Sequence, residues 1–182
     1  WVSLNGTRYL AFGTDRKLYV YTEGVTYDIT PIRETKVLTN PFTTASGNAT
    51  VTVADTAHGA LLGAFVTYTG ASPVDSLDFN QEFEIQSIVN TAAYTIAFTD
   101  GSTASGTTAG GGGTVTANYQ INTGPELSEF GYGWGTATWG GSTWGSPRTT
   151  SNATIEARQW SLDNFGEDLI ATVLNGGTFK WD

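Results

Sequence analysis

The sequence predicts an all-β fold, in which a propeller-like or meander antiparallel sheet unit carries an inserted small β-barrel or sandwich domain. Of the 182 residues, 23 are glycine, 13% are aromatic and only 14% are charged. Short segments alternate apolar and polar residues, which is the pattern of half-buried strands, and glycine-containing turns separate them. β-Branched and aromatic side chains suit a pleated surface, whereas helix-forming residues are scarce. We therefore expect almost no helix.

The amino-terminal part of the chain predicts a run of short strands. Residues 8–12 and 17–21 alternate on either side of a turn at 13–16, which indicates a hairpin. Residues 25–29 form another short strand, and we expect Pro31 to stop it or to confine it to a sheet edge. Three short strands in close succession are typical of a propeller blade or a meander.

The middle of the chain, residues 40–121, is dominated by alternating Thr, Ala and Val and predicts a self-contained β-barrel or sandwich domain. Each predicted strand places its apolar side chains on one face. The predicted strands are 49–54, 64–68, 82–88, 93–98 and 114–121. Residues 99–113 include four consecutive glycines and predict a flexible Gly-rich loop.

The last part of the chain, like the first, predicts short strands that are separated by turns. Residues 157–162, 168–173 and 178–182 predict three short strands, with a tight turn before the last. We therefore expect residues 1–38 and 122–182 to form one discontinuous, blade-like β-sheet unit. The middle domain is then inserted at a loop tip, where an insertion costs little free energy.

Charge and composition exclude several classes of partner and site. The net charge is −9, so there is no basic stripe with which to bind nucleic acid in a sequence-specific way. No apolar run approaches the roughly 20 residues that span a bilayer, so we expect no membrane partner. Cysteine and methionine are both absent, which excludes disulfides and thiolate metal sites. Because the chain begins with Trp1, we expect it to be a segment of a longer protein.

Candidate catalytic residues are few. His58 is the single histidine, and its turn-like neighbours predict an ordinary exposed turn residue. Two acidic pairs, Glu82 with Glu84 and Glu167 with Asp168, have the residue types that acid–base chemistry needs. The first pair shares the polar face of a predicted strand, which is typical of a solvated surface. The sequence therefore predicts no catalytic residue, no metal ligand, no cofactor and no enzymatic activity.

Tryptophan at positions 134, 139 and 144 forms an imperfect five-residue repeat in a glycine-rich stretch. Large amphipathic rings of this kind dominate buried interface patches, and glycine allows backbones to approach closely. We therefore predict that this segment is an extended arm that is anchored against the sheet or against a neighbouring subunit. The predicted interface residues are Tyr132, Trp134, Trp139, Trp144 and Trp160. Stacking of the same rings on sugars remains an alternative.

Both outer segments resemble structural proteins of tailed bacteriophages. Residues 9–14, 17–21 and 27–31 look like the opening blades of such proteins. Two tryptophan–glycine motifs around Trp134 and Trp139, and above all the run from Trp160 to Ala171, look like a later part of them. The resemblance is to the tail tube or nozzle (tail tubular protein B-like) family and covers roughly half of the chain.

That resemblance implies a virion protein of the phage tail with propeller-like β-structure. It implies a homo-oligomeric ring, often sixfold, around the DNA exit channel, with other tail or portal-proximal proteins and passing DNA as partners. The excess of acidic over basic residues suits a channel wall that repels DNA. Two alternatives remain: a carbohydrate-binding adhesin that uses residues 130–145, and, ranked last, a glycan-cleaving enzyme that uses Glu167 or Asp168.

Overall fold

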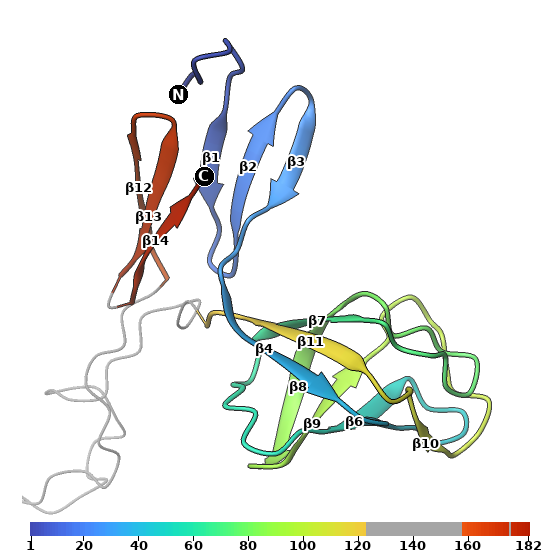
Figure 1. Ribbon diagram of the computed structural model, residues 1–182. Helices are drawn as coiled ribbons and strands as arrows, with labels where there is room; N and C mark the ends of the chain where they lie inside the picture. The colour runs from blue at the N-terminus through green and yellow to red at the C-terminus, as the bar shows by residue number, and fades with distance from the viewer. Residues whose placement is uncertain (123–157, 175) are drawn as a thin grey trace, which may run out of the picture. The chain divides into compact units, whose positions relative to one another are not determined.

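The computed structural model describes residues 1–122, 158–174 and 176–182, which form fourteen β-strands and no helix (Figure 1). The all-β prediction is therefore confirmed. The described residues contain no helix that is long and apolar enough to cross a bilayer. The chain divides into two compact units, which we call the outer unit (Trp1–Thr30 and Thr123–Asp182) and the inner unit (Pro31–Asn122).

The outer unit contains two antiparallel sheets of three strands each, and in each sheet neighbouring strands follow one another along the chain. The first sheet consists of β1 (Leu10–Gly13), β2 (Leu18–Thr22) and β3 (Val25–Asp28). The second consists of β12 (Trp160–Phe165), β13 (Asp168–Val173) and β14 (Thr178–Trp181). Glu23 and Gly24 connect β2 to β3 with positive φ angles of 48° and 86°, as a two-residue hairpin turn requires.

Each sheet of the outer unit has one buried face. Leu18 and Val20 of β2 are buried, as are Leu169, Ala171 and Val173 of β13. Aromatic rings join the two ends of the chain within this unit. The Trp1 ring stacks on Tyr9 with centroids 5.1 Å apart, and Trp181 meets both rings edge-on at 6.3 and 5.9 Å.

The inner unit is one open antiparallel sheet of eight strands, in the order β10-β5-β6-β9-β8-β7-β11-β4. Their bounds are β4 (Ile32–Leu38), β5 (Phe42–Thr43), β6 (Thr50–Ala54), β7 (Phe65–Thr69), β8 (Glu82–Asn90), β9 (Ala93–Ala97), β10 (Ala109–Gly110) and β11 (Val115–Gln120). The described strands do not close into a barrel, because β10 and β4 stand at opposite ends of this order.

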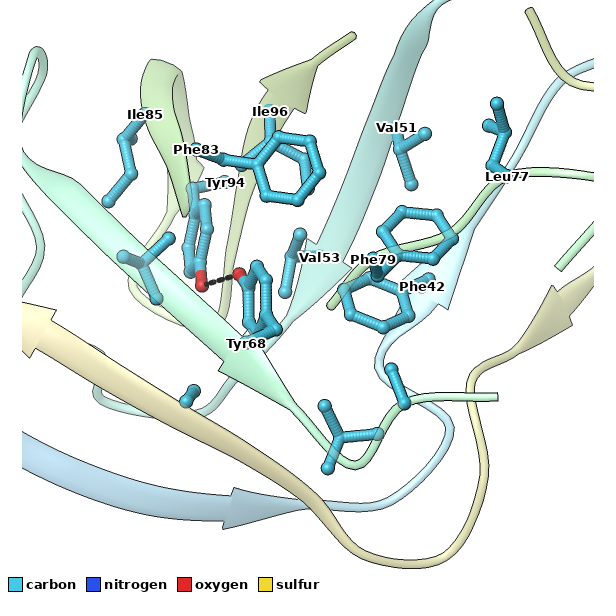
Figure 2. Close-up of a cluster of buried hydrophobic side chains, with 14 of the residues drawn as sticks. Phe42, Val51, Val53, Tyr68, Leu77, Phe79, Phe83, Ile85, Tyr94 and Ile96 are labelled. Carbon is cyan, nitrogen blue, oxygen red and sulfur yellow. Dashed lines mark hydrogen bonds between the residues drawn. The ribbon is translucent and has the colours of Figure 1, made fainter. Parts of the chain in front are cut away.

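The long strand β8 divides this sheet into two halves. Its first three residues pair with β7, whereas the residues from Ile85 onward pair with β9 through two register shifts. Such bulges bend a strand and increase its twist. Apolar side chains from both halves meet in one core, in which Phe42 and Phe79 stack 3.8 Å apart (Figure 2). The sheet thus folds over on itself around a single core.

Two features of the inner unit differ from the sequence analysis. Strand β4, within the segment 1–38 that was expected in the outer sheet, instead pairs with β11. Pro31 precedes this strand at a sheet edge, where the missing N–H costs nothing. The unit boundary therefore lies after Thr30 and not after residue 38.

The second difference concerns residues 99–113, which the sequence predicts to be a flexible loop. Within this segment β10 pairs with β5, and Ala104 is buried and donates its N–H to Asn48 O at 3.0 Å. Farther along, Gly112 and Asn40 exchange hydrogen bonds of 2.8 and 3.0 Å. The glycines therefore allow close backbone approach at the sheet edge: a Cβ at residue 111 would lie 2.6 Å from the Phe42 ring.

Candidate interaction surface

Four of the five predicted interface residues, Tyr132, Trp134, Trp139 and Trp144, lie outside the described residues. The fifth, Trp160, lies in β12 and is half-buried within the outer unit. Its indole N–H donates a 3.1 Å hydrogen bond to the Thr14 carbonyl, and a Cβ at Gly13 would lie 2.2 Å from its ring. Trp160 therefore packs on β1 inside its own chain, and its predicted contact with a neighbouring subunit stays a prediction.

A contiguous apolar surface covers one face of β1 and β2. Leu10 lies opposite Tyr21, and Phe12 lies opposite Tyr19, across the two strands. The Phe12 and Tyr19 rings stack with centroids 5.4 Å apart. Leu10, Phe12 and Tyr21 are 62%, 38% and 44% exposed. We call these four residues the β1–β2 face.

The sequence of β2 contains a signal for this surface. In β2 the residues Leu18-Tyr19-Val20-Tyr21 are apolar or aromatic on both faces of the strand, without the polar alternation of a solvated sheet. A strand of this kind is typical of a sheet that is covered on both sides. One face of β2, with Leu18 and Val20, is buried, and the other is the exposed β1–β2 face.

The edge strand β3 adds to the exposed apolar surface of the outer unit. All four of its residues are exposed, including Val25 at 47% and Tyr27 at 51%. Among the described residues, the outer unit buries five apolar side chains and exposes nine large ones, whereas the inner unit buries twenty and exposes six. The exposed apolar side chains of this protein are thus concentrated in the unit with the smaller core.

The acidic pair Glu167 and Asp168 makes structural contacts. The backbone carbonyl of Glu167 accepts a 2.9 Å hydrogen bond from the Trp1 indole, and its side chain accepts one from the Leu4 N–H. Asp168 forms a 2.8 Å ion pair with Lys180 and raises the pKa of that ammonium group. These contacts hold the hairpin between β12 and β13 against the start of the chain.

In the inner unit, Glu82 and Glu84 both line a hollow of about 240 Å³ beside the bend of β8. Glu82 accepts a 2.9 Å hydrogen bond from the side chain of Gln120. Among the residues that the structure describes, no three His, Cys, Asp or Glu side chains gather closely enough to hold a metal ion.

His58 is buried, contrary to the exposed turn position that the sequence predicts. Its Nδ1 accepts a 3.0 Å hydrogen bond from Ala60 N–H, so its Nε2 carries the proton and donates to Asn90 O at 2.9 Å. The ring also meets Tyr94 edge-on at 5.0 Å. The histidine therefore fastens the loop after β6 to the end of β8.

A chain of buried hydroxyl groups runs through the inner core. Tyr119 donates to Asp55, Tyr94 donates to Tyr119 at 2.8 Å, and Tyr68 donates to Tyr94 (Figure 2 shows the last contact). The directions follow because a carboxylate can only accept. Burial raises the pKa of Tyr94 to about 12, although its hydrogen bonds to Tyr119 and Tyr68 lower it. The pKa values of Tyr68 and Tyr119 are also raised, mainly by burial.

A search of known proteins and solved structures gives a weak structural likeness. No protein-family model and no curated protein matches the chain. Among solved structures the chain is similar to the phage phi92 endosialidase, with a TM-score of 0.43 and 16% sequence identity. The match covers 63% of this chain and 18% of that one. The chain is thus similar in part to a phage protein, and the tail tube or nozzle assignment stays a prediction.

This comparison corrects the expectation that the chain has no enzymatic activity. The similar structure is by name an endosialidase, and therefore an enzyme. The expectation came from missing catalytic motifs, but an acid–base reaction on a glycan needs only two suitably spaced carboxyl groups, which carry no local sequence motif. Missing motifs are therefore no evidence against activity in a chain of this kind.

Proposed function

We propose that this chain is a structural module of a phage tail and that the β1–β2 face is its contact surface with a neighbouring protein. The observation that carries the proposal is the two-sided apolar strand β2, of which one face is buried and the other is exposed. A contiguous exposed apolar patch marks an interaction site, whereas scattered apolar residues do not. The pairing of Leu10 with Tyr21 and of Phe12 with Tyr19 makes this patch contiguous.

The composition of the patch suits a protein partner. Fully burying one large apolar side chain contributes about 1.5–3 kcal/mol, so covering three side chains that are already partly buried contributes on the order of 3 kcal/mol. Aromatic residues are enriched in the energetically dominant part of interfaces, and two tyrosines and a phenylalanine lie here. This face supplies the centre of an interface, and further contacts are needed around it.

The finer form of the proposal is a tail tube or nozzle component that assembles as a homo-oligomeric ring. Its support is the resemblance of the outer segments, which include β1 and β2, to that family. In such a ring, the β1–β2 face contacts the next subunit or another tail or portal-proximal protein. The net charge of −9 allows DNA to pass without being retained.

Assembly of the purified chain tests this proposal by light scattering, followed by electron microscopy with phage particles. We expect oligomers that the double variant Phe12→Gln/Tyr21→Gln abolishes. The control is Val37→Gln, because Val37 is 66% exposed on the inner unit and should be dispensable. A chain that stays monomeric, is absent from particles and gives hits on a glycan array would overturn the proposal in favour of the adhesin.

A further inference from the structure

One lysine spans the open side of the inner sheet. Lys36 lies on the edge strand β4, and its ammonium group contacts the segment that follows β6 in the other half of the sheet. It lies 3.1 Å from Asp55 Oδ1 and donates hydrogen bonds of 3.1 and 2.9 Å to the carbonyls of Thr56 and Ala57. Because β4 and β6 do not pair, this side chain joins strands that the backbone ladder leaves apart.

The carboxyl group that Lys36 meets is buried. The side chain of Asp55 is only 3% exposed, and its second oxygen accepts the hydroxyl hydrogen of Tyr119. A further carboxylate stands beside the amine, because Glu34 lies two residues earlier on the same side of β4, with Oε1 3.9 Å from Lys36 Nζ. An amine, a buried carboxyl group and a neighbouring base are therefore assembled in one place.

We propose that Lys36 and Asp55 join in an intramolecular amide, or isopeptide, bond. The ammonium group gives one proton to Glu34, and the freed lone pair of Nζ attacks Asp55 Cγ. Oxygen Oδ1 then takes that proton from Glu34 and a second one from Nζ and leaves as water. The nitrogen keeps one hydrogen, Glu34 is again a carboxylate, and neither an oxidant nor a cofactor is required.

The geometry favours this condensation in two ways. Groups that are held together in one molecule gain the large advantage of an intramolecular reaction. The ion pair holds Lys36 Nζ 3.1 Å from Asp55 Oδ1, which is bonded to the carbon that the amine attacks. The Tyr119 hydroxyl is a fixed donor to the oxygen on which negative charge develops during the attack.

The product would link the two halves of the sheet covalently. The chain has no cysteine, so no disulfide can serve this purpose. An amide between β4 and the residue after β6 closes the open side of the core. It also keeps the edge strand β4 from separating when mechanical force acts on the chain. The inference concerns the inner unit and is independent of the proposed contact through the β1–β2 face.

Intact-mass spectrometry of the purified full chain tests the bond directly. We expect a mass lower than that of the sequence by one water molecule, and an unshifted mass for Lys36→Arg, which keeps the charge but cannot form the amide. In Asp55→Asn the same attack releases ammonia, so the deficit should change to one ammonia molecule. Glu34→Gln should slow the reaction and leave a mixture of both masses.

Peptide mapping locates the bond, because cyclisation at Asp100-Gly101 would also remove one water molecule. Chymotrypsin cuts after Phe42, between the two residues, and should release a branched peptide that contains both Lys36 and Asp55. Circular dichroism shows whether each variant folds. An intact mass that equals the sequence mass after prolonged incubation, in a folded chain, would overturn the proposal, and so would a deficit that maps elsewhere.

Discussion

The hydroxyl chain of the inner core predicts a graded series of stabilities when each tyrosine is replaced by phenylalanine. Tyr68→Phe removes the outermost donor and leaves only an acceptor, the Tyr94 oxygen, with one bond fewer. Tyr94→Phe leaves the Tyr68 hydroxyl as a buried donor without an acceptor. Tyr119→Phe leaves both the Tyr94 hydroxyl and a side-chain oxygen of Asp55 without their partners.

The expected losses follow from what each change leaves unpaired. An ordinary hydrogen bond contributes about 1 kcal/mol and a buried unsatisfied group costs about 1–3 kcal/mol, so a change that leaves two buried groups unpaired costs most. We therefore expect losses in the free energy of unfolding of about 1 kcal/mol for Tyr68→Phe, about 2 kcal/mol for Tyr94→Phe and about 3 kcal/mol for Tyr119→Phe. The ring packing is nearly unchanged in all three variants.

The measurement can be restricted to the inner unit. Residues 31–122 contain no tryptophan, so tryptophan fluorescence does not report directly on the inner unit. Urea unfolding followed by hydrogen exchange of amides in β6 and β9 reports on the inner core. We expect the urea midpoint seen by hydrogen exchange to fall least for Tyr68→Phe, more for Tyr94→Phe and most for Tyr119→Phe. The slope of the free energy of unfolding against urea concentration should not change. A loss for Tyr68→Phe as large as that for Tyr119→Phe would refute the assigned donor directions.

Three further predictions concern strain, packing and pH. Gly13→Ala forces the Trp160 ring to move and should lower the free energy of unfolding by about 1–3 kcal/mol. Tryptophan fluorescence should then show unfolding at a lower urea concentration. The control is Gly113→Ala, whose added methyl group meets no atom and should have little effect. Ser76 has a φ of 70°, in the left-handed region that glycine adopts without strain. Ser76→Gly should therefore increase the free energy of unfolding by about 0.5–1 kcal/mol and raise the melting temperature of the inner unit. A lowered melting temperature would contradict this. Between pH 10 and 12 the unfolded chain loses the Tyr94 proton before the folded chain does, because the folded pKa is about 12. The stability that Tyr94 contributes below pH 10 should therefore fall by about 1.4 kcal/mol per pH unit in that window, and less steeply in Tyr94→Phe.

The sequence predicted strands well wherever apolar residues alternate with polar ones. In β6, β7 and β9, large apolar or aromatic residues alternate with threonine, and a period of two directly decides which side chains enter the core. The pattern was weaker at β4, where Arg, Glu and Lys interrupt the apolar positions at a sheet edge. Edge strands lack a second neighbouring strand and tolerate charged side chains, so the alternation of apolar and polar residues is weak in their sequences.

The polar part of the inner core could not be predicted. The tyrosines at 68, 94 and 119 come from three separate strands, and only the register of β7, β9 and β11 brings their hydroxyls together. Burial of His58 likewise depends on two backbone groups, at Ala60 and Asn90, and the second lies 32 residues away. Contacts of this kind are set by tertiary packing and have no local pattern.

The two ends of the inner unit lie side by side. Ile32 at the start of β4 is the register partner of Gln120 at the end of β11, and Ile121 N donates a 2.9 Å hydrogen bond to Pro31 O. A segment that enters and leaves at one point can be gained, lost or exchanged during evolution with little disturbance to the chain around it, because the bridge that replaces it need be only a short loop. Residues 31–122 can therefore be exchanged as one unit during evolution while the outer unit stays the same.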